Sequence, residues 1–206
     1  MTSATSDAPE LALAALADQL RDEDSVISPF VTDPGISPGL GLLAAAGPCA
    51  REARAEYALL VECVREGYLL HYGEGRVVAG VDPNLALLAG DYLYARGLER
   101  LAGLGDIDAV GELSDLISLL AQLHVRDDPP AHGAEWLWLA GMVAVAVGRS
   151  EPHERAKTLI REQRPEGIEN LAAVAIADAE CCGLQSELAI AVETVGLKKT
   201  DLDDFG

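Results

Sequence analysis

The chain has 206 residues, half of them hydrophobic, and its 34 acidic and 15 basic residues give a formal net charge of −19. This balance excludes nucleic acid and anionic membrane surfaces as partners, because both require clustered lysine and arginine. The length suits one packed domain, and the abundance of alanine and leucine favours helices. We therefore predict an all-α fold with a single domain over residues 1–206.

We expect no export signal in this chain. No basic leader with an apolar stretch opens the chain, and no apolar run approaches the ~20 residues of a membrane-spanning helix. The four cysteines lack the spacing of a metal site. We expect a cytoplasmic protein without a membrane span. Its acidic, lysine-poor composition is typical of halophilic proteins, although an ordinary acidic protein fits as well.

The N-terminal segment combines one helix with a long loop. Residues 1–6 are small and polar, and we expect them to be loose. A helix with a stripe of leucines follows, and prolines then predict a loop over residues 25–38. Residues 39–47 are rich in glycine and alanine and form either a short helix or a hinge. Whether the segment 25–47 closes over a pocket as a lid stays open.

Two long helices follow. The first is expected over residues 48–72, with acidic side chains on its solvated side, and the second begins at Asp82, a favourable N-cap. On the second helix, Leu87 and Leu88 start an apolar stripe at helical spacing, which we expect to be the buried face. Asp91 lies on this stripe, so it must be hydrogen-bonded inside the bundle or face a cavity.

The C-terminal half is also predicted to be helical. Residues 134–147 are apolar nearly all round, which indicates a central buried helix, and either Trp136 or Trp138 could lie at an interface. Residues 168–195 form one helix or two, and the acidic tail 197–206 is expected to be loose. The whole chain should form a bundle of about seven or eight helices without a strand.

One segment resembles a known family. Residues Ala86–Leu93, with the sequence ALLAGDYL, resemble the A-I-L-A-G-D-x-L segment of polyprenyl (trans-isoprenyl) diphosphate synthases, and the resemblance covers roughly residues 55–125. It implies an isoprenoid-synthase-like bundle.

Members of that family hold Mg²⁺ with a D-D-x-x-D motif on the preceding helix, and the metal grips the diphosphate of the allylic substrate. The family spacing places this motif on Glu62-Cys63-Val64-Arg65-Glu66. Glu62 and Glu66 keep the outer carboxylates one helical turn apart, so they become candidate Mg²⁺ ligands if the chain is catalytic. The alternative is an acidic helix face with Arg65 as a local partner.

The family's diphosphate-binding R-R-G falls on His71-Tyr72-Gly73, where only the glycine is kept. The resemblance implies His71, Tyr72 and Asp91 as candidate substrate-binding residues, and Asp91 as the candidate catalytic group. A histidine at this place can instead interact with the helix dipole. The family's second aspartate-rich motif has no counterpart, because the aspartates of residues 201–204 are interpreted as a solvated tail.

We therefore expect a non-catalytic relative of these synthases that needs no cofactor. It would act as a partner or regulatory subunit, in a homo- or hetero-oligomer with a prenyl diphosphate synthase, and the apolar helix 134–147 could supply the interface. The first alternative is a prenyltransferase or terpene-type synthase with Glu62, Glu66 and Asp91 around Mg²⁺. The second is a module that binds an isoprenoid without converting it.

Overall fold

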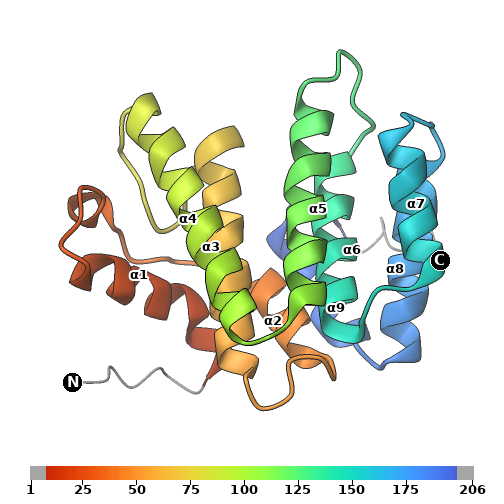
Figure 1. The fold of residues 1–206 in the computed structure, drawn as a ribbon, viewed down its shortest axis with the longest axis horizontal. Coiled ribbons are helices and arrows are strands. Elements are labelled where there is room, and N and C mark those ends of the chain that lie inside the picture. Colours follow the sequence, from red (N-terminus) through yellow and green to blue (C-terminus); the bar gives the residue numbers. More distant parts are fainter. Residues whose placement is uncertain (1–7, 199–206) are drawn as a thin grey trace.

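A computed structural model describes residues 8–198 (Figure 1). This range contains nine α-helices, two short 3₁₀-helices and one isolated β-bridge. The predicted all-α class is confirmed, although the number of helices is higher than expected. Residues 1–6 and most of the tail 197–206, both expected to be loose, lie outside the described residues.

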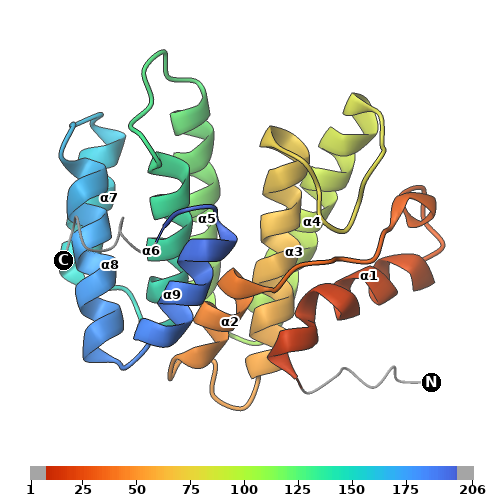
Figure 2. The same ribbon diagram turned by 180° about the vertical axis from the view of Figure 1, so that it is seen from behind.

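The helices form two groups with a short helix between them. Their bounds are α1 Ala12–Asp22, α2 Gly39–Ala46, α3 Arg54–Tyr72, α4 Pro83–Gly103, α5 Ile107–His124, α6 Gly133–Val147, α7 Glu151–Arg161, α8 Gly167–Cys181 and α9 Gln185–Thr194, with 3₁₀ turns at Pro9–Leu11 and Ser28–Phe30. Figures 1 and 2 show α1 at one end of the molecule and α7 with α8 at the other. Helix α2 packs against α3, α6 and α9, so it joins the two groups.

The glycine-rich segment 39–47 forms a helix and not a hinge. Helix α2 is almost entirely buried, and a Cβ atom on Gly41 would lie 2.7 Å from the carbonyl oxygen of Ala58 in α3. Only a residue without a side chain allows this approach. Residues 168–195 form two helices and not one, because Gly183, with a φ of +72°, separates α8 from α9.

The buried face of α4 differs from the predicted one. Leu87 and Leu88 are exposed, whereas Gly90, Leu93 and Gly97 face α3. A Cβ on Gly97 would lie 2.5 Å from Cγ2 of Val64. Close packing of two backbones therefore decides which face is buried, and a search for large apolar side chains misses such a face.

The loop between α1 and α2 is fastened to the segment that joins α3 to α4. The backbone N–H of Thr32 donates to the carbonyl of Val77 over 2.8 Å, and that of Ala79 donates to the carbonyl of Phe30 over 3.0 Å. Ile27, in the same loop, is buried in a small core cluster between α1 and α4. The loop is thus part of the packed structure.

Helix α6 lies inside the molecule, as predicted. Trp136 and Trp138 are only 1% and 0% exposed, so the expectation that one of them, or α6 itself, supplies an interface is wrong. Among the described residues, no helix combines the length and apolarity that crossing a membrane requires.

Candidate functional site

Glu62 and Glu66, the candidate Mg²⁺ ligands, are both completely buried. They project from α3 toward α2 and toward residues 76–78 of the following connection. The alternative prediction of a solvated acidic helix face is therefore wrong. Burial of two carboxylates without partners would be very costly, so both need hydrogen-bond donors or cations inside the protein.

Arg76 lies between the two glutamates and pairs with both. Its Nη1 donates to Oε2 of Glu62 over 2.7 Å, and its Nε donates to Oε2 of Glu66 over 3.3 Å. Backbone N–H groups donate to the remaining oxygens. The N–H of Gly41 donates to Oε1 of Glu62 over 2.7 Å, and the N–H groups of Val77 and Val78 donate to Oε1 of Glu66 over 2.8 and 2.9 Å. Each of the four carboxylate oxygens of Glu62 and Glu66 therefore accepts a hydrogen bond.

This arrangement does not fit Mg²⁺. The metal needs several free oxygen ligands, and here a guanidinium already occupies the position between the carboxylates. Arg65 is not their partner, although it is close in sequence. Arg76 was missed because it follows the helix by several residues, in a segment whose fold the periodicity of α3 does not predict.

The structure brings the candidate residues His71 and Asp91 together at the surface. Nε2 of His71 lies 3.2 Å from Oδ1 of Asp91, whose side chain is 73% exposed. The imidazole also stacks on the ring of Tyr94, and Gly90 leaves room for it. The expectation that Asp91 is held inside the bundle or faces a cavity is wrong, since the predicted buried stripe is the exposed one.

Tyr72, the third candidate, belongs to an aromatic cluster formed by Tyr68, Tyr72, His124 and Trp138. The rings of Tyr72 and His124 stack in parallel at 4.0 Å, and the hydroxyl of Tyr68 lies 3.0 Å from Nε2 of His124. The guanidinium of Arg65 lies over the rings of Tyr68 and Trp138, at 4.7 and 4.8 Å. A chain with few aromatic residues thus gathers several of them around one cation.

Arg65 is a half-buried cation beside these aromatic rings. Burial and the nearby charge of Arg76 lower its pKa to about 10, and no ion pair joins it to a carboxylate of the described residues. Arg76 and Lys157, by contrast, each pair with at least two carboxylates. The buried Nε1–H of Trp138 also lacks an acceptor within the described range. Such a site can receive an anion.

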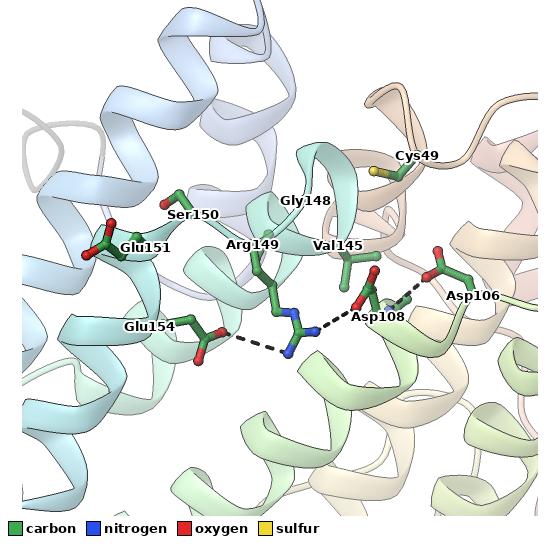
Figure 3. Close-up of a pocket in the computed structure, with 11 residues that line it drawn as sticks. Cys49, Asp106, Asp108, Val145, Gly148, Arg149, Ser150, Glu151 and Glu154 are labelled. Carbon is green, nitrogen blue, oxygen red and sulfur yellow. Dashed lines mark hydrogen bonds and ion pairs between the residues drawn. The ribbon is translucent and has the colours of Figure 1, made fainter.

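A separate cavity of about 510 Å³ lies where α5 and α7 begin and α6 ends. Figure 3 shows Arg149 at its centre, with its guanidinium 2.7 Å from Oδ1 of Asp108 and 3.9 Å from Oε1 of Glu154. Asp106, at the rim, caps α5 and accepts a hydrogen bond from the hydroxyl of Tyr57 over 2.5 Å. The acidic side chains of this cavity are therefore largely paired within the protein.

A charge network joins α5 to α7 and shares Glu154 with this cavity. Glu112 accepts hydrogen bonds from Nζ of Lys157 (2.7 Å) and is paired with Nε2 of His153 (2.9 Å). Lys157 also lies 3.0 Å from Asp115 and 2.9 Å from Glu154. Although Glu112, His153 and Glu154 are close enough together to hold a metal ion, the ammonium group already supplies the positive charge there.

The pKa values in this network reflect the pairing. Burial alone would raise the pKa of Glu112, but the hydrogen bond and charge of His153, together with Lys157, lower it below the ordinary value. Burial would lower the pKa of Lys157, yet Glu112 and the other carboxylates raise it. Both groups are therefore charged at neutral pH. No sequence motif indicated this network, because its residues come from two helices distant in the chain.

Comparisons of the chain with protein-family models, with curated proteins and with solved structures find no match.

Proposed function

We propose that the chain is a non-catalytic, isoprenoid-synthase-like protein that acts as a partner or regulatory subunit of a prenyl diphosphate synthase. The observation that carries the non-catalytic part is the pairing of Glu62 and Glu66 with Arg76. Together with the backbone donors, Arg76 engages all four oxygens that the Mg²⁺-dependent alternative needs. The partner role rests on the resemblance of residues 55–125.

The first experiment separates the partner from an enzyme. The purified chain is incubated with Mg²⁺, isopentenyl diphosphate and an allylic diphosphate, and we expect no condensation product. When the chain is co-expressed with a prenyl diphosphate synthase, we expect the two to co-elute in size-exclusion chromatography and the product length of the synthase to change. Metal-dependent product formation by the chain alone would support the prenyltransferase alternative instead.

Arg65 favours a second candidate function, the binding of an isoprenoid diphosphate without turnover. A half-buried guanidinium that forms no ion pair with a carboxylate of the described residues can hold an anionic head group, and the adjoining aromatic rings offer apolar surface. Calorimetric titration with a non-hydrolysable allylic diphosphate analogue tests this candidate. We expect Mg²⁺-independent binding that Arg65→Met abolishes and that Arg155→Met, at an exposed arginine, preserves. Equal binding by both variants would contradict it.

The proposal also includes a cytoplasmic location and adaptation to high salt. The support is the net charge of −19, since a surface of like charges destabilises the compact state unless salt screens the repulsion. Thermal unfolding in increasing potassium chloride tests the second part. A midpoint that rises steadily with salt agrees with it, and a midpoint that does not change speaks for an ordinary acidic protein.

A further inference from the structure

An apolar groove lies between α4 and residues 23–27, which directly follow α1. Figures 1 and 2 show the end of α1 and the start of α4 on the side of the molecule opposite α7 and α8. The volume of the groove is about 470 Å³. The residues that line it are Glu23, Ser25, Val26, Ile27, Leu85, Leu88, Ala89 and Tyr92. Most of these are apolar, which distinguishes the groove from the acidic cavity beside Arg149.

The apolar side chains of this groove are exposed to an unusual degree. Val26 is 75% exposed and Leu88 is 67% exposed, and Tyr92, one helical turn after Leu88 on α4, is 42% exposed. Single exposed apolar residues are common on soluble proteins, but adjoining ones that line a groove are typical of interaction sites. The outward face of α4 therefore lacks a packing partner within the described residues.

The groove is held in shape by hydrogen bonds between α1 and α4. The hydroxyl of Tyr92 donates to Oε2 of Glu23 over 2.7 Å, and Nη1 of Arg96 donates to that hydroxyl over 2.8 Å. Arg96 is also ion-paired with Glu23 and donates to Gln19 over 2.9 Å. A preformed groove of this kind binds with little loss of conformational freedom.

The charges near the groove indicate the chemistry of its occupant. Asp22 and Asp24 flank Glu23 on the α1 side, Asp91 precedes Tyr92 on α4, and all three aspartates are exposed. The nearby arginines are already paired with carboxylates: Arg96 with Glu23, Arg21 with Asp18 and Asp33, and Arg100 with Glu56. A second copy of the chain, with its own charge of −19, would be repelled, and so would an anionic membrane.

We infer that this groove, between α4 and residues 23–27, binds an amphipathic helix whose apolar stripe is flanked by lysine or arginine. Leu85, Leu88 and Tyr92 recur at helical spacing along one side of α4, so they form a ridge against which another helix packs. The inference rests on the proposed function only in that the helix would belong to the partner synthase.

A synthetic peptide tests the groove directly. The probe is an 18-residue fluorescein-labelled peptide with leucines at helical spacing and lysines elsewhere, compared with a twin in which every lysine is glutamate. Fluorescence anisotropy should show saturable binding of the lysine peptide, at least about tenfold tighter than that of its twin. Leu88→Asp should weaken binding about tenfold or more, and Asp22→Asn with Asp24→Asn should reduce the preference for lysine.

Ile107→Asp is the matched control, because Ile107 is 67% exposed, as Leu88 is, but lies at the start of α5. It should leave binding unchanged, and circular dichroism should show that both variants fold. Equal binding of the two peptides, or equal effects of the two variants, would overturn the inference. A dimer of the chain in sedimentation velocity that Leu88→Asp dissociates would overturn it in favour of self-association.

The two proposals fail separately. Co-elution of a synthase with both the wild type and Leu88→Asp would preserve the proposed function and refute the groove as its docking site. Displacement of the peptide by a neutral fifteen-carbon isoprenoid alcohol, with an affinity above that of the peptide, would instead identify the groove as a lipid site and refute the helix.

Discussion

Two buried charge networks stabilise opposite parts of this molecule, and they are built differently. In the first, Glu62 and Glu66 are neutralised by Arg76 and by backbone N–H groups, so that side chains from α3 hold a non-helical segment in place. In the second, Glu112 and Lys157 join α5 to α7 through side chains alone. The first network closes a loop, and the second links two helices.

The comparison shows that similar carboxylates can be placed by different local rules. The backbone N–H groups of a buried loop need acceptors. Oε1 of Glu66 accepts hydrogen bonds from the N–H groups of both Val77 and Val78. Two helices have no such free donors along their lengths, so Glu112 must find a lysine and a histidine. The first network should tolerate the loss of its cation less well than the second, because Glu62 and Glu66 are completely buried whereas two carboxylates of the second network are partly exposed.

The largest effect is expected for Arg76→Met. This change leaves two fully buried carboxylates without their shared cation, and we expect a loss of about 3–5 kcal/mol in the free energy of unfolding. Urea denaturation measures it. Arg155→Met, which removes an exposed pair with Glu151, should cost about 0.5 kcal/mol or less. If both variants lost the same free energy of unfolding, Arg76 would not be needed to neutralise the buried carboxylates.

Lys157→Met should have a smaller effect, about 2–4 kcal/mol, because Asp115 and Glu154 are partly exposed and water can solvate them. Glu112 would keep its contact with His153. The same urea titration gives the value. A loss larger than that of Arg76→Met would reverse the proposed ranking of the networks.

Gly97→Ala tests the packing of α3 on α4 independently of charge. The added Cβ would lie 2.5 Å from Cγ2 of Val64 and 3.3 Å from the carbonyl oxygen of Leu60, so we expect a destabilisation of about 1–3 kcal/mol. Gly103→Ala, on the same helix but in open space, should be neutral or stabilise by up to about 1 kcal/mol. A neutral Gly97→Ala in thermal unfolding would argue against the close approach.

The second network should make stability depend on pH. The pKa of Glu112 is lowered from its ordinary 4.5, so its contribution is present above that value and is lost as the pH falls through the folded-state pKa. The pKa of Lys157 is raised from 10.5, so its contribution is present below that value and is lost at still higher pH. Glu112→Gln should therefore flatten the acid limb of stability against pH, whereas Glu169→Gln, on the surface of α8, should not.

The smallest effect is expected for Asp91→Asn. Like Glu112, Asp91 lies close to a histidine, but it is exposed and water screens the pair. We expect a change of less than about 0.5 kcal/mol in the free energy of unfolding, measured by urea titration. A substantially larger loss would mean that the contact with His71 is shielded from water.

The parts of the fold that depend on local sequence were predictable. Asp82 caps α4 and Asp106 caps α5, and the apolar segment of α6 is buried, because capping and periodicity are short-range properties. The buried face of α4 was predicted wrongly, since Gly90 and Gly97 fit α3 by their lack of volume. A pattern of apolar side chains does not indicate where glycines let two helices approach closely.

The candidate site was predictable only in part. The motif spacing selected Glu62 and Glu66, but their burial and their pairing with Arg76 depend on how the chain returns after α3. Arg65 was seen only as a neighbour in the motif, and its place over the rings of Tyr68 and Trp138 requires Trp138 of α6 to meet side chains of α3. Contacts between distant segments are set by tertiary structure, which a single sequence does not display.

The crossing of the α1–α2 loop with residues 77–79 has a consequence for local opening. The amides of Thr32 and Ala79 donate across this crossing, to the carbonyls of Val77 and Phe30. The amides of Val77 and Val78 donate to the carboxylate of Glu66 in α3, which also pairs with Arg76. Opening at Arg76 therefore frees all four at once. In native-state hydrogen exchange these amides should exchange with one common free energy, as a single cooperative unit.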